Sequence, residues 1–405
     1  MSYPLRILHV VTAFPRYPDD VIAPWLVELI RRLRAAGHEV EVFTSAYRGG
    51  GNRELEGIPI HRFRYLPARL EDLTHDEAVP ERLKRDWRYR LGVPCYLLGG
   101  MLGAWRLCRR RQYDIVHVHW PMPHVLFGWV ARAACGAHLV VTFYGVELRW
   151  VKSRMTWLRG FLAWAARSAD RVVAISEYTA AEIRELADVP ITVIPYGIGL
   201  AEPGAERPPQ AGRAAGAKGP FTALFVGRLV ARKGVPTLLE AAGRLAPTLG
   251  LRVSVIGEGS ERPALEALVA RDGLQDVVTL RGRVPSGELV RAYQEADVLV
   301  LPAVVDARGD TEGLGVVLLE AMSCGTPVVA SDIGGITDIV THDQTGLLVP
   351  PGDPAALATA IQRLATDPAL WRRLAEAGRR RFHADFSWTA ITRRWEETYR
   401  AAVTH

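Results

Sequence analysis

The chain has 405 residues, of which 49% are hydrophobic and 23% charged, with a formal net charge of +6. This length exceeds what one hydrophobic core usually holds, so we expect two domains of a globular protein. Four widely separated cysteines indicate neither a disulfide framework nor a zinc site, and the sequence shows no secretory signal and no wholly apolar window of about 18 residues, so we expect a cytoplasmic protein that spans no membrane.

The first half of the sequence alternates buried strands with amphipathic helices. Residues 5–11 predict a strand, residues 22–36 a helix that ends at Gly37, and residues 39–44 the next strand. Short turns between such elements indicate a parallel, doubly wound sheet. Further strands are expected at residues 114–119, 138–143 and 171–175, and further helices at residues 96–110, 122–134, 156–168 and 177–186.

A stretch rich in Pro, Gly and Ala at residues 200–220 predicts a linker, because it contains almost no large apolar residue. After it the same alternation starts again and predicts a second Rossmann-like domain, in which a ligand would lie at the carboxyl ends of the strands. Its strands are expected at residues 221–226, 251–256, 277–280 and 298–301, its helices at residues 235–246, 263–271 and 286–296, and a last amphipathic helix follows Phe386.

A polar turn with two glycines leads into an apolar helix at residues 310–323. The N–H groups of a first helical turn lack partners within the helix and lie at the positive end of its dipole. An anion is therefore expected to bind near Gly315 and Val316. Glu312 and Glu320 bracket this position, and their carboxylates suit sugar hydroxyls rather than phosphate. The pattern therefore suits a sugar nucleotide, although a helix with an acidic first turn is the simpler alternative.

The spacing of Glu312 and Glu320, followed by residues 324–331, 334–335 and 345–350, resembles the C-terminal half of family 4 retaining glycosyltransferases. The resemblance implies the α/β GT-B fold, in which two Rossmann-like domains face each other across a cleft. It predicts a retaining transfer of a hexose from GDP-mannose or a UDP-sugar to an acceptor hydroxyl.

The same resemblance assigns roles to the predicted domains. Residues 1–199 would bind the acceptor, residues 221–385 would bind the nucleotide sugar, and the helix in residues 386–405 would return to the N-terminal domain. A last helix that completes the C-terminal domain instead is the alternative.

Two basic residues, Arg228 and Lys233, follow the first strand of the second domain at its carboxyl end. Arg228 can hold an anion by a forked pair of hydrogen bonds and Lys233 as a point charge. A solvated surface pair is the alternative. The resemblance to the Gly-Arg-Leu…Lys-Gly motif of the family implies that both hold the donor diphosphate and offset the charge on the leaving group.

The turn at residues 256–260 contains glycines that let the backbone approach a ligand, but it lacks the third glycine of a dinucleotide fingerprint. By resemblance, the residues after the next strand contact the nucleotide base. The donor-binding residues implied in this way are Gly257, Arg283, Val284, Glu312, Gly313, Leu314, Gly315, Val316 and Glu320, and the catalytic ones are His119, Arg228, Lys233 and Glu312.

Two histidines, His117 and His119, lie on the same face of a predicted strand. With His124 nearby a metal site is one alternative, but the spacing is not a zinc pattern, so no metal is expected. A core role suits His117, whereas the resemblance implies that His119 contacts the donor sugar. The sequence also contains no Asp-x-Asp triplet, so we expect neither a diphosphate-bound metal nor a cofactor, the nucleotide sugar being a co-substrate.

On the acceptor side, Tyr144 and Glu147 stand where the family more often has the His and Asp of a His-Gly-x-Asp loop. Both can bind an acceptor hydroxyl, but the ordinary pKa of about 10 for a tyrosine disfavours Tyr144 as a general base. Arg16, in the first loop, either meets an anionic part of a substrate or is an exposed loop residue. The chain also departs from the family pattern at residues 195–199 and at Asp338.

Basic and aromatic residues interleave at residues 149–164, which include Lys152, Arg154 and Arg159. Such a stretch can lie at the inner face of the membrane beside anionic headgroups, with support from the arginines of residues 82–90 and 106–111, or its aromatics are core and its charges solvated. No nucleic-acid partner is expected, because the donor site already accounts for basic residues.

The expected partners are a nucleotide-sugar donor and an acceptor that is a glycan, a lipid or a small molecule. Two other functions stay open. One is a sugar-nucleotide epimerase or a phosphorylase on the same fold. The other is a non-catalytic protein that binds nucleotide sugars, because several motif positions depart from the family.

Overall fold

The structure is a computed structural model that divides into two compact units. The first comprises Met1–Pro195 together with Ile391–His405, and the second comprises Tyr196–Ala390. The predicted linker at residues 200–220 lies outside the described residues except for residues 219 and 220. The structure describes residues 3–17, 20, 22–50, 53–75, 79, 82, 86–153, 155–198, 219–307 and 309–404.

The first unit is built on an eight-stranded sheet with the order β3-β4-β2-β1-β5-β6-β7-β8. All neighbouring strands are parallel except the short hairpin of β3 and β4. The predicted doubly wound sheet is therefore confirmed, with its change of winding direction between β1 and β5. The strands are β1 (Arg6–Val10), β2 (Glu39–Ser45), β3 (Glu54–Leu55), β4 (Ile58–Phe63), β5 (Ile115–His119), β6 (His138–Phe143), β7 (Arg171–Ala174) and β8 (Ile191–Val193).

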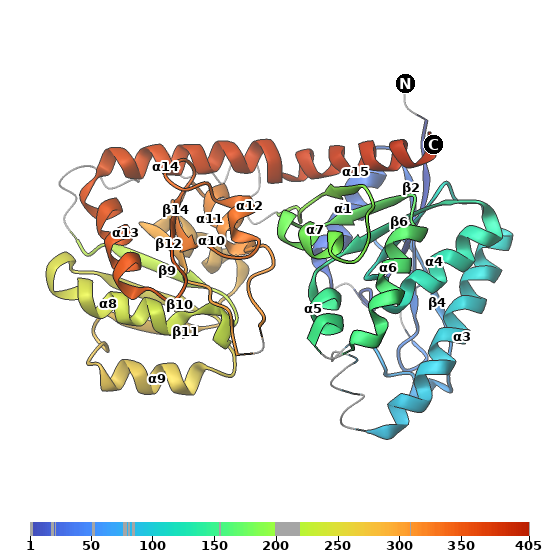
Figure 1. Cartoon of the computed structure of the whole chain (residues 1–405), viewed down its shortest axis with the longest axis horizontal. Coiled ribbons are helices and arrows are strands. Elements are labelled where there is room, and N and C mark those ends of the chain that lie inside the picture. Colours follow the sequence, from blue (N-terminus) through green and yellow to red (C-terminus); the bar gives the residue numbers. More distant parts are fainter. Residues whose placement is uncertain are drawn as a thin grey trace. The chain divides into compact units, whose positions relative to one another are not determined.

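Helices cover both faces of this sheet (Figure 1). On one face α3, α4 and α6 pack together over a core of Val, Leu and aromatic residues. On the other face the rings of Trp395 and Tyr399, from α15, lie against His117 of β5. The helices are α1 (Pro24–Ala35), η1 (Ala68–Leu70), α3 (Trp87–Arg110), α4 (Pro121–Cys135), α5 (Val146–Ser153), η2 (Thr156–Leu158), α6 (Arg159–Ser168), α7 (Glu177–Arg184) and α15 (Trp388–Val403).

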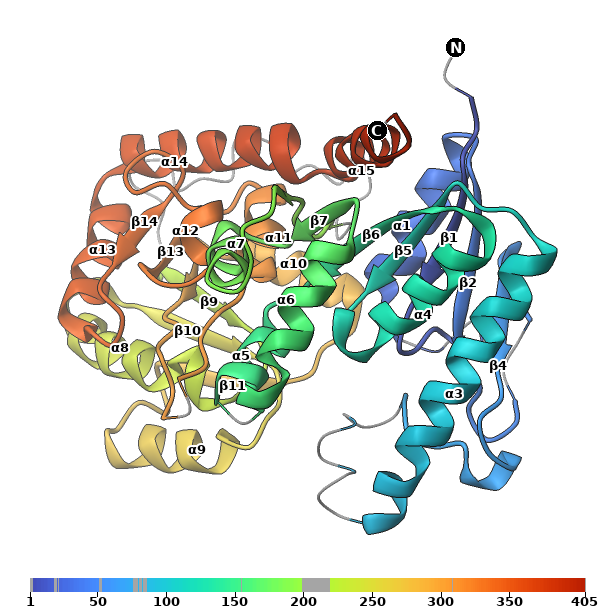
Figure 2. The same ribbon diagram turned by 45° about the vertical axis from the view of Figure 1, so that its right-hand side comes forward.

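Helix α3 begins at Trp87, whereas the sequence predicted a helix from about residue 96. Its start is set by Asp86, whose side chain accepts a hydrogen bond from the Arg88 N–H and so satisfies one unpaired donor of the first turn. The helix continues through Pro94. Among the described residues it is the one helix long and apolar enough to cross a membrane by length and composition alone, but core helices pass the same test, and α3 packs against α4 (Figures 1 and 2).

The second unit contains a six-stranded parallel sheet with the order β11-β10-β9-β12-β13-β14. In chain order this is the 3-2-1-4-5-6 arrangement of nucleotide-binding folds, which bind ligands where the winding reverses. Here the reversal lies between β9 and β12. The strands are β9 (Thr222–Val226), β10 (Arg252–Ile256), β11 (Val278–Gly282), β12 (Val298–Leu301), β13 (Val328–Ser331) and β14 (Leu347–Val349).

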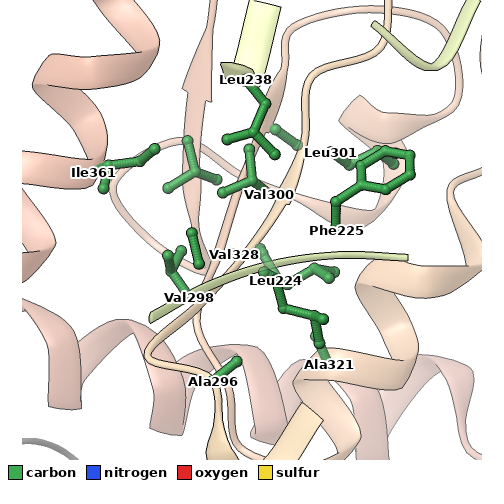
Figure 3. Close-up of a cluster of buried hydrophobic side chains, with 14 of the residues drawn as sticks. Leu224, Phe225, Leu238, Ala296, Val298, Val300, Leu301, Ala321, Val328 and Ile361 are labelled. Carbon is green, nitrogen blue, oxygen red and sulfur yellow. The ribbon is translucent and has the colours of Figure 1, made fainter. Parts of the chain in front are cut away.

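The core of the second unit is made of buried apolar side chains from the strands and from the helices that cover them. Figure 3 shows Leu224 and Phe225 of β9 beside Val300 and Leu301 of β12, with Leu238 of α8 near them. β9 and β12 pair in parallel at the centre of this core, with Leu299 beside Leu224. The helices of the unit are η4 (Ala231–Lys233), α8 (Val235–Leu249), α9 (Arg262–Arg271), α10 (Ser286–Glu295), α11 (Val316–Ser323), α12 (Ile336–Ile339), α13 (Pro354–Thr366), α14 (Pro368–Arg381) and η5 (Phe382–Phe386).

Candidate functional site

The loops that follow β9 and β12 carry the basic and acidic residues of the candidate donor site. Lys233 ends the short helix η4 after β9, and Glu312 lies between β12 and α11. Because β9 and β12 are paired in parallel, both loops leave the same edge of the sheet at the reversal point. The structure thus brings together two residues that lie 79 positions apart in the sequence.

Lys233 and Glu312 form a nearly buried ion pair, each with only 8% of its surface exposed. The Lys233 Nζ lies 2.5 Å from Glu312 Oε2, and the Arg232 Nη1 lies 2.9 Å from the same oxygen. Burial raises the pKa of Glu312, but the charges and hydrogen bonds of Lys233 and Arg232 outweigh it and leave the pKa below its ordinary value. Glu312 is therefore an ionised carboxylate held between two cations.

Arg232 belongs to this cluster although the sequence analysis did not single it out. Its guanidinium also lies 3.5 Å from the carboxylate of Asp310. Its place in the same short basic loop, directly before Lys233, was the available signal. Arg228, which was predicted, has an exposed side chain in the same loop.

The predicted anion-binding position lies at the start of α11. This helix begins at Val316, and the residue before it, Gly315, has a left-handed backbone conformation. Leu314 is buried and fixes this turn to the core. The loop is held further by the glycine pair after β13, since the Gly335 N–H donates to the Glu312 carbonyl at 3.0 Å. The predicted loop Glu312 to Val316, which includes Gly313, therefore has a defined backbone next to the Lys233 ion pair.

Glu320 lies within α11 and is partly exposed. It accepts a hydrogen bond of 2.5 Å from the hydroxyl of Tyr293, which comes from α10. Burial raises the pKa of Glu320 to about 7, although the Tyr293 hydrogen bond and the charge of Lys233 act against it. Its predicted role at the nucleotide ribose stays a prediction.

The remaining predicted donor residues follow β10 and β11. Gly257 has a φ of 141°, and a Cβ atom there would lie 1.8 Å from the carbonyl oxygen of Gly227. The loops after β9 and β10 can therefore contact each other only because position 257 has no side chain. Arg283 is exposed, and Val284 packs partly against the core. Since β9, β10 and β11 are parallel neighbours, all these residues line the same sheet edge.

In the first unit, His119 is fully buried beside a third histidine, His9 of β1. The His9 Nδ1 lies 2.8 Å from His119 Nε2, and the other ring nitrogen of His119 lies 2.6 Å from the Tyr144 hydroxyl. The Trp25 ring lies 5.7 Å from that of His119. Both His119 nitrogens are thus engaged within the unit, and its predicted contact with the donor sugar stays a prediction.

His9, His117 and His119 each place one ring nitrogen within 4.8 Å of the others, a spacing at which three histidines could hold a metal ion. The two ring nitrogens of His117 lie 2.8 Å from the hydroxyls of Tyr399 and Thr142. Within the described part of the chain, only His9 Nε2 lacks a hydrogen-bond partner among these ring nitrogens. A metal would have to replace hydrogen bonds that already orient the rings, so the arrangement suits a core network better. Burial lowers the pKa of all three, to about 3 for His9.

Tyr144 and Glu147 lie together at the start of α5, as the acceptor-side prediction requires. The Tyr144 N–H donates to Glu147 Oε1 at 2.7 Å, while Glu147 Oε2 is buried and has no partner among the residues that the structure describes. Burial raises the pKa of Glu147 to about 7 despite the opposing backbone hydrogen bonds. Such a carboxyl group can hold or release a proton near neutral pH.

The raised pKa of Glu147 predicts a stability that falls as pH rises. Below pH 4.5 the group is protonated in both states, but above it the unfolded chain releases the proton while the folded chain retains it, up to a pKa of about 7. The penalty reaches on the order of 3 kcal/mol. Glu147→Gln should therefore reduce the fall in melting temperature between pH 5 and pH 8. The exposed variant Glu397→Gln is the control, and an unchanged pH slope for Glu147→Gln would contradict the prediction.

Arg16 is held inside the first unit and is partly buried. Its Nε lies 2.7 Å from Asp20 Oδ2, and its guanidinium lies 4.8 Å from the centre of the Tyr47 ring. It follows β1, whose carboxyl end flanks the reversal point of the first sheet. The loop position agrees with the prediction, while a substrate contact remains untested.

The basic and aromatic stretch at residues 149–164 is mostly tied to the first unit. Phe161 and Trp164 pack against its core. The Lys152 Nζ lies 3.4 Å from a carboxylate oxygen of Glu185, and Arg159 donates to the Glu185 carbonyl. Arg154 lies outside the described residues. These contacts favour the core alternative for Phe161 and Trp164, whereas Trp157 is 78% exposed.

Comparison with known proteins covers both units. The profile described as Glycosyltransferase Family 4 matches residues 23–202, and the profile Glycosyl transferases group 1 matches residues 210–381. A D-inositol 3-phosphate glycosyltransferase of Streptomyces bingchenggensis is 31% identical over 408 residues, which cover 94% of this chain and 84% of that protein. A glycogen synthase of Mycobacterium tuberculosis is 28% identical over 414 residues, covering 98% and 95% of the two chains.

Solved structures show the same fold. The sucrose-phosphate synthase from Thermosynechococcus elongatus matches with a TM-score of 0.72 at 26% identity, over 97% of this chain and 98% of that one. The Anabaena protein HepE, solved in complex with UDP and glucose, matches with a TM-score of 0.66 at 20% identity, over 97% and 99%. These likenesses bear out the GT-B fold. On this sequence and structural similarity, the chain belongs to glycosyltransferase family 4 and is a glycosyltransferase.

Proposed function

We propose that this glycosyltransferase moves a hexose from a nucleotide-diphosphate sugar to an acceptor hydroxyl, with retention at the anomeric carbon and without a divalent metal. The observation that carries the proposal is the cluster of Arg232, Lys233 and Glu312 at the reversal point of the second sheet, beside the start of α11. Cations next to a helix N-terminus suit a diphosphate. A carboxylate between them suits sugar hydroxyls.

In this proposal the ion pair exchanges partners when the donor binds. Lys233 and Arg232 neutralise Glu312 in the absence of donor. With donor present, the two cations turn to phosphate oxygens, and Glu312 accepts hydrogen bonds from the sugar. Arg228 adds a further charge at the same edge. With donor bound, these cations stabilise the negative charge that develops on the leaving diphosphate.

The proposed chemistry is a displacement on one face of the sugar. The bond between the anomeric carbon and the diphosphate oxygen breaks, the acceptor oxygen bonds to that carbon on the same face, and the acceptor proton passes to the departing phosphate. We assign Glu320 to the nucleotide ribose, Gly257, Arg283 and Val284 to the base and its surroundings, and His119, Arg16, Tyr144 and Glu147 to the donor sugar and the acceptor.

The comparisons support this choice of substrates without naming them. One relative is named for an inositol phosphate acceptor and another for glycogen, and HepE was solved with UDP and glucose. The proposed donor is a UDP-sugar, in keeping with the UDP bound to HepE, or GDP-mannose, which the family resemblance also implies. The acceptor class is a glycan, a lipid or a small molecule with a free hydroxyl.

The test is thermal stabilisation of the pure protein by a panel of nucleotides and nucleotide sugars, with and without magnesium. A ligand that binds only the folded state raises its melting temperature, by an amount that grows with concentration over Kd. We expect a rise with diphosphates of one base, equal in magnesium and in chelator. A rise only with magnesium would overturn metal independence, and no rise with any diphosphate would overturn the donor assignment.

A further inference from the structure

Five large apolar side chains lie exposed in a row along α3. They are spaced by four, seven, four and three residues, so all point to one side of the helix over about 27 Å. We call this set the α3 stripe. With their exposed fractions its members are Trp87 (65%), Leu91 (64%), Leu98 (64%), Leu102 (46%) and Trp105 (47%).

The opposite side of α3 is anchored in the first unit. A Cβ atom at Gly100 would lie 2.2 Å from the Phe127 ring of α4, and one at Gly103 would lie 2.9 Å from Phe63 of β4. The helix therefore lies close against its neighbours, as Figure 2 shows for α3 and α4. The α3 stripe is thus a surface of the folded unit, and exposing it requires no movement of the helix.

Charge is confined to the ends of this helix. Residues 91–105 carry no charged side chain, while residues 86–111 contain six arginines and one aspartate, Asp86, which caps the helix. Arg109 lies 5.8 Å from the Trp105 ring. The arginines are Arg88, Arg90, Arg106, Arg109, Arg110 and Arg111, all with exposed side chains; Arg111 also pairs with Glu41.

An apolar row with tryptophan and arginine at both ends has the properties of an interfacial helix. Apolar side chains enter the boundary between headgroups and acyl chains, tryptophan prefers the headgroup level, and arginine pairs with anionic headgroups. A second copy of this chain suits the stripe less well, because both ends are basic and either orientation brings arginine against arginine. A membrane-spanning position would require the glycine side to leave Phe127.

From this pattern we infer that α3 docks the first unit onto a bilayer surface containing anionic lipids, lying in the plane of the interface. The helix keeps its contacts with α4, while the side chains of the α3 stripe leave water and contact the outer part of the acyl chains. This assigns membrane contact to α3 rather than to residues 149–164, where Phe161 and Trp164 pack partly against the core and Lys152 and Arg159 contact Glu185. The inference does not depend on the identity of the donor or the acceptor.

Flotation with vesicles tests the docking surface. Wild-type protein should bind vesicles of phosphatidylcholine with phosphatidylglycerol, and bind vesicles of phosphatidylcholine alone much less. The triple variant Leu91→Gln, Leu98→Gln and Leu102→Gln should lower the binding constant by more than about tenfold, because three apolar side chains no longer enter the interface. Arg106→Glu with Arg110→Glu should lower it by more than about tenfold as well.

Matched control variants show whether binding depends on the α3 stripe itself. Trp157→Gln removes the exposed tryptophan of the other basic stretch, and Arg380→Glu with Arg393→Glu reverses two exposed charges elsewhere, so both should bind as wild type. All variants should keep the wild-type melting temperature. Wild-type affinity in the triple variant, or equal binding to both vesicle types, would overturn the proposal. A wild-type dimer that the triple variant dissociates in sedimentation would assign the stripe to self-association instead.

Discussion

Lys233→Ala should lower kcat/KM of glycosyl transfer by roughly 10²–10³-fold, the loss typical of one preorganised group that stabilises a developing negative charge. Lys233 is nearly buried and lies 2.5 Å from Glu312, so its ammonium group is held at the candidate donor site before substrate arrives. The loss should fall on turnover as well as on donor affinity, because the charge on the leaving diphosphate is largest in the transition state. Initial rates over a range of donor concentrations measure both.

The control separates chemistry from folding. In Lys233→Ala, Glu312 keeps its bond to Arg232 at 2.9 Å, so the carboxylate is not left alone and the melting temperature should change little. Lys152→Ala, at an exposed site whose side chain is 68% accessible, should leave kcat/KM unchanged. A Lys233→Ala enzyme that is folded and within about twofold of wild type would remove Lys233 from the proposed mechanism.

Gly257→Ala should destabilise the second unit by about 3 kcal/mol or more, placing it among the severe single substitutions. The new Cβ would lie 1.8 Å from the Gly227 carbonyl oxygen, and the left-handed φ of 141° adds strain. The loops after β9 and β10 would have to separate, and with them the backbone that leads to Lys233. Calorimetric melting of the variant measures the cost, and nucleotide binding measures the damage to the site.

Gly273→Ala is the matched control, since Gly273 also has a positive φ, of 67°, but no atom within 4 Å of an added Cβ. It should cost only about 1 kcal/mol from backbone strain. The difference between the two variants isolates the contact between Gly257 and Gly227. Equal costs would show that the two loops adapt and that close packing does not fix the site.

The sequence predicted nine of the fourteen strands that the structure describes in the two sheets, because runs of apolar β-branched residues between turns and helices are typical of buried strands. It missed β3, β4, β8, β13 and β14. It also predicted the loop before α11, whose glycines and carboxylates lie close together in the chain. It missed Arg232 and His9, because each acts through a partner more than 70 residues away. Such pairs form only because the strand order of the sheet places their two loops or strands side by side. The local sequence around either residue does not reveal that strand order.

Other differences concern helix ends and the burial of polar residues, which the periodicity of apolar residues does not predict. The start of α3 was placed too late, because the first turn depends on the cap at Asp86 rather than on apolar spacing. The sequence analysis did not predict the neighbours of His119, which are His9, Tyr144 and Trp25, and its contact with the donor sugar stays a prediction. The burial of a polar strand residue depends on which other elements pack against that face of the sheet. The sequence of the strand itself does not specify these elements.

Helix α15 has a consequence for the order in which the chain folds. Its residues complete the first unit, where the Tyr399 hydroxyl lies 2.8 Å from His117 and Glu396 lies 3.1 Å from His38. A growing chain emerges from the ribosome N-terminal end first, and domains usually fold in that order. Here the second unit can close its core while the first still waits for about fifteen residues at the far end of the chain. The unit that is synthesised first is therefore finished last, and until then His117 lacks the Tyr399 hydroxyl and the Trp395 ring that α15 places against it.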